Sequence, residues 1–307
     1  MNIFFAPVIL FVYNRPKHTA KVLKNLKNNY LAKKTELLIF SDGPKNKEDF
    51  LQVKEVRNII NKIKGFKSLT VYERLKNIGL SNNIVLGLNQ FFKKNKSAII
   101  LEDDLIVDKY FLYYMNCGLT IYKNEKKVIS IHGYSYPTKD RTPNFFFLKG
   151  ADCWGWATWK RGWNIYNSNS NYLFEKLKKK NLLKKFDFEN SYPYSRILRD
   201  NIKKKNISWA TNWYASAFLK NKLTLYPGRS LVKNIGTDGS GTNFGNVNYF
   251  STKAKLLNRK IEVKKIKIEE CATSRNQFIL FFNESQSYVS KFVNYLRKVK
   301  IDFFKKN

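Results

Sequence analysis

The first 130 residues alternate short apolar runs with segments whose apolar residues recur every three or four positions. The short runs predict four buried strands, at residues 6–13, 36–40, 69–72 and 97–101. The spaced segments predict helices with one apolar face, at residues 19–30, 53–63, 84–92 and 110–122. Ser81 is expected to cap the third helix. This alternation predicts an α/β fold with a mostly parallel, Rossmann-like sheet that carries helices on both faces.

The pattern changes after about residue 132, where segments rich in Gly, Trp, Asn and Ser replace the regular alternation. All six tryptophans lie between Trp154 and Trp213. Long aromatic stretches beside a regular sheet are typical of walls that face a substrate. We therefore divide the chain into residues 1–132, a second half of the same domain at 133–252, and an extension at 253–307.

The C-terminal extension ends in a basic amphipathic pattern. The last 20 residues hold six basic side chains and one acidic one. Their apolar residues fall on one helical face, namely Val289, Phe292, Val293, Leu296, Val299 and Phe303. Such a helix can lie in a membrane interface or pack on its own domain, and the sequence leaves both open.

The composition excludes several classes of protein without identifying one. A chain of 307 residues with 43% hydrophobic residues can bury a large core. Its apolar runs are too short for a transmembrane helix, and residues 1–13 lack the pattern of a signal peptide. Three widely spaced cysteines argue for a reducing compartment, and with only two histidines any metal must be held by oxygen ligands.

The net charge of +34 favours anionic partners such as phosphorylated substrates or anionic lipid. The excess is mostly lysine spread along the whole chain, which also fits a bias in composition without function. No patch combines arginine with aromatic residues, so nucleic acid is not an expected partner.

Three polar clusters follow the predicted strands, and the carboxyl ends of parallel strands are where ligands bind. The clusters are at residues 13–16, 41–44 and 102–104. The three adjacent acids Glu102, Asp103 and Asp104 repel one another unless a cation or hydrogen-bond donors compensate. They therefore predict a Mg²⁺ or Mn²⁺ site, with helix capping as the alternative.

The other two clusters are less specific on their own. Asp42 sits in a Ser-Asp-Gly-Pro turn, a composition common in turns without function. Arg15, before Pro16, could bind a phosphate or a base, or pair with an acid. Neither a GxGxxG motif nor a Walker-type loop is present, which disfavours dinucleotide and P-loop phosphate sites.

Taken together, these motifs resemble those of nucleotide-sugar-dependent glycosyltransferases with the GT-A fold. The stretch from Ile100 to Tyr114 is similar to the metal-motif region of the N-acetylglucosaminyltransferase I type, which uses Glu-Asp-Asp. Later segments resemble bacterial lipopolysaccharide and capsule transferases, at residues 150–159, 208–216 and 226–241. The resemblance covers roughly residues 5 to 245. It implies a nucleotide-sugar-binding half at residues 1–132 and an acceptor-binding half at 133–252.

Carried over to this chain, the resemblance implies a role for each motif residue. Asp104 would bind Mn²⁺ or Mg²⁺ directly, Asp103 would face the ribose, and Glu102 would support the site. Asp42 would accept a hydrogen bond from uracil, and Arg15 would contact the nucleotide. The family has a histidine where Asn83 falls here, and the segment that carries its catalytic aspartate corresponds to Ala210–Asn212, which has no carboxylate.

An inverting transfer needs another carboxylate to take the proton of the acceptor hydroxyl. Asp152, before the tryptophan cluster, and Asp238, in a glycine-rich loop, are the two candidates. Asp152 could instead cap a helix, and Asp238 could be a turn residue or a second metal ligand. A retaining mechanism would need neither.

The tryptophans complete the expected acceptor site. Trp154, Trp156 and Trp159 are expected to stack on sugar rings, with core packing the alternative for at least one of them.

The sequence thus predicts a metal-dependent transferase that moves a sugar from a nucleotide donor, UDP-linked by the resemblance, to a hydroxyl of a cell-surface glycan or its lipid-linked precursor. We expect it on the cytoplasmic side, with an anionic membrane surface as a candidate partner. A nucleotidyltransferase, or a non-catalytic protein that binds nucleotides or polyanions, is the alternative.

Overall fold

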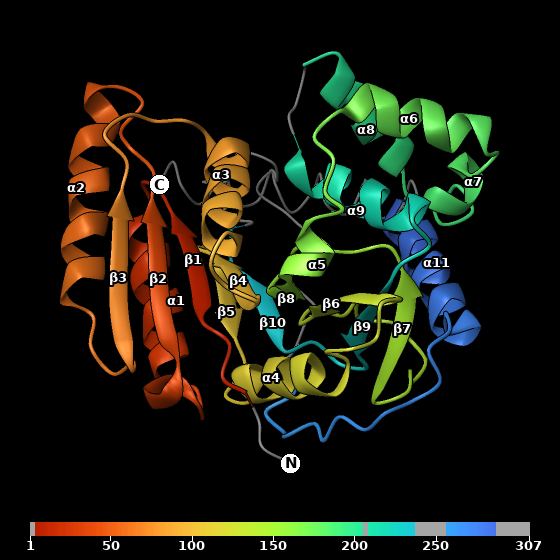
Figure 1. The fold of residues 1–307 in the computed structure, drawn as a ribbon, viewed down its shortest axis with the longest axis horizontal. Coiled ribbons are helices and arrows are strands. Elements are labelled where there is room, and N and C mark those ends of the chain that lie inside the picture. The colour runs from red at the N-terminus through yellow and green to blue at the C-terminus, as the bar shows by residue number, and fades with distance from the viewer. Residues whose placement is uncertain (1–3, 205–207, 237–255, 287–307) are drawn as a thin grey trace, which may run out of the picture.

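The computed structural model describes residues 4–204, 208–236 and 256–286. An eight-stranded sheet crosses the molecule in the order β3-β2-β1-β4-β8-β6-β9-β7 (Figure 1). Its strands are β1 (Val8–Val12), β2 (Glu36–Ser41), β3 (Ser68–Glu73), β4 (Ser97–Glu102), β6 (Val128–His132), β7 (Phe145–Lys149), β8 (Trp156–Trp159) and β9 (Leu223–Pro227). A small second sheet pairs β5 (Leu105–Val107) with β10 (Val232–Asn234).

Most strands of the large sheet point the same way. Strands β3, β2, β1 and β4 are parallel neighbours, and β6 and β9 pair in parallel. Strands β8 and β7 run antiparallel to their neighbours. The expected α/β fold with a mostly parallel, Rossmann-like sheet is therefore confirmed.

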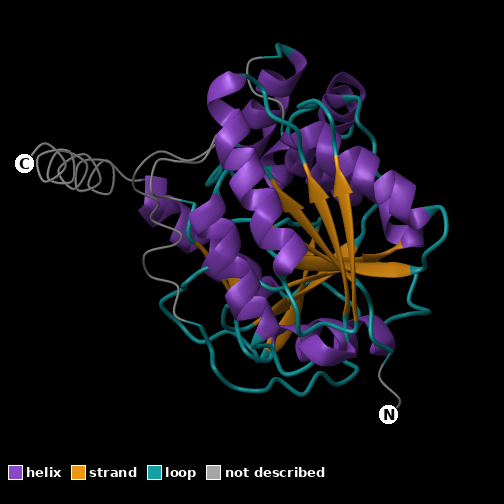
Figure 2. Cartoon of the chain, turned by 90° about the vertical axis from the view of Figure 1, so that its left-hand side faces the viewer, coloured by secondary structure: helices purple, strands orange, loops and turns teal. Residues whose placement is uncertain are grey.

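Helices cover both faces of this sheet (Figure 2). The helices are α1 (Pro16–Lys27), α2 (Lys47–Lys62), α3 (Leu80–Phe92), α4 (Phe111–Ile121), α5 (Lys160–Trp163), α6 (Ser170–Lys179), α7 (Leu183–Phe186), α8 (Tyr194–Ile202), α9 (Trp209–Leu219) and α11 (Ala272–Gln286), with a 3₁₀ turn at Ala32–Lys34. Alternate residues of β1 and β4 enter two cores: one lies under α1, α2 and α4, the other under α3, α5 and α9. Burial on both faces explains why these strands are continuous apolar runs.

The second half is more regular than its sequence indicates, because it contains strands β7 to β9 and several helices. Nine of the 11 residues of α9 are buried, and so is every residue of β8. An element buried on all sides has no polar face, so the amphipathic pattern that reveals a surface helix is missing. In the first half, Ser81 lies inside α3, whose N-cap is Gly79, so the expected cap is wrong.

The end of the described chain packs on the second half. Helix α11 contributes Phe278, Phe281 and Phe282 to a third core beside α8 and α9. The predicted terminal helix at residues 289–303 lies outside the described residues, and the division at residue 252 stays a prediction. Among the described residues, no helix is both long and apolar enough to cross a membrane.

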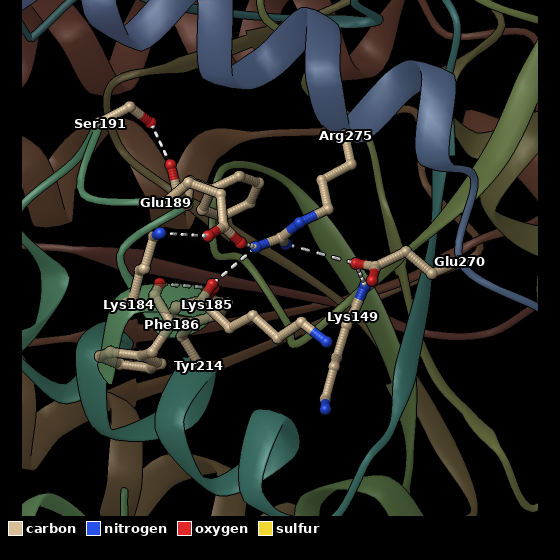
Figure 3. A network of polar contacts seen from close by, with 10 residues as sticks. Lys149, Lys184, Lys185, Phe186, Glu189, Ser191, Tyr214, Glu270 and Arg275 are labelled. Carbon is tan, nitrogen blue, oxygen red and sulfur yellow. Dashed lines mark hydrogen bonds and ion pairs between the residues drawn. The ribbon is translucent and has the colours of Figure 1, made fainter. Parts of the chain in front are cut away.

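A buried arginine fixes α11 to this half (Figure 3). The Arg275 guanidinium is 11% exposed, lies between Glu189 and Glu270 at 3.5 and 3.4 Å, and donates to the Lys185 carbonyl at 2.7 Å. It also stacks on Phe188, with 4.6 Å from its central carbon to the ring centre. One side chain thus links α11 to the turn after α7.

We expect Arg275→Met to lower the free energy of unfolding by about 2 to 3 kcal/mol, because it removes the buried cation between Glu189 and Glu270 and its hydrogen bond to the Lys185 carbonyl. Urea denaturation measures this loss. Arg196→Met, at an exposed position of α8, is the matched control and is expected to change stability by less than about 0.5 kcal/mol. Equal losses in the two variants would contradict this account of the network.

Candidate active site

The main cavity opens at the carboxyl ends of the parallel strands. Strand β1 pairs with β2 on one side and with β4 on the other, so the strand order reverses at β1. In parallel sheets a crevice forms at such a point, outside the carboxyl ends of the strands. The cavity there has a volume of about 960 Å³. Polar groups after β1, β2 and β4 line one end, and an aromatic wall from the second half lines the other. The topology thus brings together the three polar clusters that the sequence singles out.

The acidic cluster is held by one arginine. Arg15 donates to Asp103, and its guanidinium also bonds Asp104 at 3.0 Å. Asp103 accepts the Tyr13 backbone N–H at 3.3 Å and is 4% exposed, so it serves the internal network. Asp104 is less buried and lines the cavity. The sequence assigned Arg15 to the nucleotide; here it pairs with the acids, the alternative that the sequence left open.

Arg15 does not neutralise the whole cluster. Burial raises the pKa of the Glu102 carboxyl to about 8, and the charges of Asp104 and Asp103 add to this rise. Burial also raises the pKa of Asp104, while Arg15 opposes it. The raised pKa values show that these acids repel one another when charged, so a further cation would lower the pKa values and be stabilised here.

The donor set fits a divalent cation that is shared with a ligand. No group of three or more His, Cys, Asp or Glu side chains within the described segments is arranged to hold a metal on its own. Mg²⁺ and Mn²⁺ commonly bind through one or two carboxylates plus substrate phosphates, for which Asp104 suffices.

Gly236 closes the cluster from the opposite side. A side-chain carbon added there would lie 2.4 Å from Asp104 Oδ2 and 3.0 Å from an Arg15 nitrogen. Its position is fixed because its backbone N–H donates to Asn234 at 2.7 Å and the preceding Ile235 N–H donates to the Asp104 carbonyl at 2.8 Å. Space beside Asp104 therefore depends on glycine at this position, which the sequence alone did not indicate.

Asp42 and Asn83 are bound to the protein itself. Asp42 is 3% exposed and accepts the backbone N–H groups of Gly43, Ile78 and Gly79 at 2.9 to 3.0 Å. It thus shapes the loop before α3, although it also lines the cavity. Asn83 is 2% exposed and accepts a bond from Arg74 at 2.6 Å. The predicted contacts of both residues with the nucleotide stay predictions.

Asp152 marks the other end of the cavity. It follows β7, is partly exposed, and accepts the Cys153 backbone N–H at 2.8 Å. Of the acids that line the cavity in the described part of the chain, it is the one that belongs to the aromatic end. The aromatic residues around it in the cavity lining are Tyr136, Phe188, Tyr192, Tyr194, Tyr214, Tyr226 and Phe278.

Burial raises the pKa values of Tyr192, to about 12, and of Tyr194 and Tyr226, and the Asp152 charge adds to each rise. The phenols therefore stay protonated at neutral pH. Protonated phenols beside a carboxylate offer donors, an acceptor and flat apolar faces at once. This combination fits a ligand with several hydroxyl groups, such as a sugar.

A buried histidine positions the loop that carries Asp152. His132, at the end of β6, is fully buried, and its Nε2 accepts the Trp154 backbone N–H at 3.1 Å. Burial lowers the pKa of His132, against the opposing effect of Asp152, so the ring is neutral and keeps its acceptor.

The three tryptophans predicted for the acceptor site lie in different environments. Trp154 lines the cavity, next to Tyr134. Trp156 and Trp159 do not: they are 0% and 7% exposed and belong to the two cores on opposite faces of the sheet. They stand in strand β8, where residues three apart point to opposite faces. Their expected stacking on an acceptor is therefore wrong.

Asp238 lies outside the described residues, so its predicted catalytic role stays a prediction. Ala210 and Thr211, at the start of α9, line the cavity, and they belong to the segment that the resemblance singled out.

The cavity-lining tyrosines were not predicted from the sequence, because they are scattered between residues 136 and 226 whereas the tryptophans are clustered. The closely spaced pairs Tyr134–Tyr136 and Tyr192–Tyr194 were the local signals.

Comparisons with known proteins give only distant likenesses. Neither a protein-family model nor a curated protein matches the sequence. Among solved structures, the chain is similar to the mannosyltransferase PcManGT from Pyrobaculum calidifontis in complex with GDP-Man and Mn²⁺, with a TM-score of 0.38, 12% identity and 70% of each chain covered. It is also similar to TarS of S. aureus, with a TM-score of 0.37 and 14% identity over 76% of this chain.

A UDP-glucose pyrophosphorylase complexed with UDP-glucose is the third similar structure, with a TM-score of 0.33, 12% identity, and coverage of 72% of this chain and 90% of that one. The match to TarS spans 37% of the length of that protein. These scores are too low to assign a function, which we therefore argue from the cavity itself.

Proposed function

We propose that this protein is a metal-dependent glycosyltransferase that moves a sugar from a nucleotide donor, a UDP-sugar, to a hydroxyl of a glycan. One observation carries the proposal. A single cavity joins an acidic cluster at the carboxyl ends of the strands to a tyrosine-lined wall around Asp152. The first end suits a metal-bound diphosphate and the second suits a sugar, and a transferase needs both beside each other.

In this mechanism Asp104 would hold a divalent cation together with the phosphates of the donor, and such a cation would offset the charge that develops on the leaving diphosphate. Arg15 keeps Asp103 and Asp104 oriented, and Glu102 lies behind them as a further acid of the cluster. Asp152 accepts the proton of the acceptor hydroxyl, so that the oxygen can attack the anomeric carbon and invert it. The tyrosines position the acceptor and exclude water.

The acceptor and the cellular location are proposed from the sequence. The acceptor belongs to a cell-surface glycan, of the lipopolysaccharide or capsule kind, or to its lipid-linked precursor. The protein works on the cytoplasmic side, peripherally at the membrane where its basic C-terminus binds. Both statements rest on the resemblance and on the charge pattern of the chain.

Product analysis tests the reaction type. We expect the full-length protein, incubated with Mn²⁺ and single UDP-sugars, to release UDP slowly by transfer to water, and faster when glycan acceptors are added. Release of pyrophosphate from UTP and a sugar 1-phosphate would instead establish a nucleotidyltransferase, which also needs acids and a metal at these strand ends. Neither product from a protein that melts cooperatively would overturn both enzymatic functions.

A further inference from the structure

A second hollow lies beside the aromatic end of the cavity and has the opposite charge. It has a volume of about 1170 Å³ and is formed by the β6–β7 loop, the β9–β10 loop and residues 257–266. We call it the basic groove. Its charged lining consists of Lys139, Arg141, Arg229, Arg259, Lys260 and Lys264, with the acids Asp140 and Glu262.

The charged lining of the groove contrasts with that of the main cavity. Six cations and two acids line it, whereas the main cavity is lined by five acids and three cations. Arg141, Arg229 and Arg259 are exposed and have no acidic partner within 4.0 Å among the residues that the structure describes. An anion would therefore be attracted to the groove, whereas the acidic cavity beside it favours an anion that carries a bound cation.

Two features indicate a built binding site. The Ser135 side chain lines the groove and is 3% exposed, yet its hydroxyl has no hydrogen-bond partner in the described part of the chain. The wall is also held in place: Lys139 pairs with Glu284 of α11 at 2.5 Å, and Asp140 accepts a bond from Gln277 at 2.9 Å.

The groove continues from the proposed acceptor site. Tyr136 lines both hollows, and its ring packs on Phe278 of α11 at 4.8 Å between ring centres. A chain whose end lies against Asp152 and the tyrosines would reach the groove by passing this residue. A flat membrane surface does not enter a concave groove, so a linear chain fits better.

We propose that the basic groove binds an anionic segment of the acceptor, a linear chain with repeated phosphate or carboxylate groups, whose terminal sugar lies in the tyrosine-lined cavity. The proposal rests on the proposed function for the identity of that terminal sugar. The arginines contribute charge-assisted hydrogen bonds to the oxyanions, which are stronger than neutral ones. The acceptor is therefore an acidic polymer and not a neutral oligosaccharide.

Binding measurements on the full chain test this. The probes are fluorescently labelled polyphosphate of about ten units, an acidic oligogalacturonate of similar length, a neutral dextran, single-stranded oligo(dT) and vesicles with phosphatidylglycerol. The groove variant is Arg229→Gln with Arg259→Gln. The control is Lys54→Gln with Lys94→Gln, which removes the same charge at exposed positions of α2 and just after α3.

We expect the groove variant to bind polyphosphate or oligogalacturonate about tenfold more weakly, and the control less than twofold more weakly. The slope of log Kd against log salt should fall by about one to two in the groove variant alone. The difference between polyphosphate and oligogalacturonate identifies the oxyanion. Equal weakening in both variants, or a selective loss of oligo(dT) or vesicle binding, would overturn the proposal.

The melting shift of the groove variant with UDP-sugar and Mn²⁺ separates this inference from the proposed function. We expect that shift to equal that of the wild type. If the acidic chain binds through the groove but nucleotides do not shift the melting temperature of the wild type, the proposed transferase function is overturned and the groove proposal stands. If nucleotides shift the melting temperature but binding of the acidic chain does not depend on the groove, the groove proposal is overturned and the transferase function stands.

Discussion

Asp104→Asn is expected to abolish the metal-dependent binding of the nucleotide donor and to reduce donor turnover by about a thousandfold. Asp104 is partly exposed and lines the cavity, and Gly236 leaves space beside its carboxylate. Losing it removes a ligand from a cation that contributes several kcal/mol to stabilising the departing diphosphate. In the wild type, a ligand at 100 times its Kd adds about 2.7 kcal/mol of stability, which thermal melting detects.

Asparagine weakens the ion pair with Arg15 but keeps an oxygen that accepts its hydrogen bond, and it relieves repulsion among the acids, so we expect little change in the melting temperature without ligand. Asp200→Asn, on α8, is the matched control and should keep the full shift with UDP-sugar and Mn²⁺. Gly236→Ala provides a second approach, since its methyl group would press on Asp104 Oδ2 at 2.4 Å. We expect it to weaken binding of the metal and nucleotide about tenfold.

An Mn²⁺-dependent shift that survives in Asp104→Asn would place the metal elsewhere and contradict the assignment of this residue.

Asp152→Asn is expected to leave donor binding intact and to lower the rate of transfer to the acceptor by about 10² to 10⁴. General bases typically contribute a factor of this size, and the amide cannot take the proton of the attacking hydroxyl. Because Asp104 and not Asp152 is proposed to hold the cation, the melting shift with UDP-sugar and Mn²⁺ should match that of the wild type. Rates at saturating donor, with added glycan acceptors, measure the loss.

Two further variants make this result specific. Asp200→Asn again controls for the chemical change. Asp238→Asn tests the second candidate from the sequence, which lies outside the described residues. If Asp152→Asn transfers at the wild-type rate while Asp238→Asn does not, the base is Asp238. If both retain full activity, the reaction needs no carboxylate base of this kind, as a retaining mechanism would allow.

The sequence determined the first half of the molecule in detail. Its four predicted strands are β1 to β4, because strands buried on both faces leave continuous apolar runs and the helices between them leave one-sided stripes. Since parallel strands end at one edge, the positions of Arg15, Asp42 and Asp104 along the chain were enough to predict that they gather at one site.

Tertiary structure alone decided the second half. Helix α9 and strand β8 are buried on all sides, so no periodicity shows where they begin or which residues face a ligand. Trp156 and Trp159 were expected at the acceptor but fill the core, whereas the tyrosines that line the cavity come from separate loops and helices. The space that Gly236 leaves beside Asp104 depends on contacts more than 100 residues apart in the chain. Local sequence patterns record burial and turns, and carry no information about such distant neighbours.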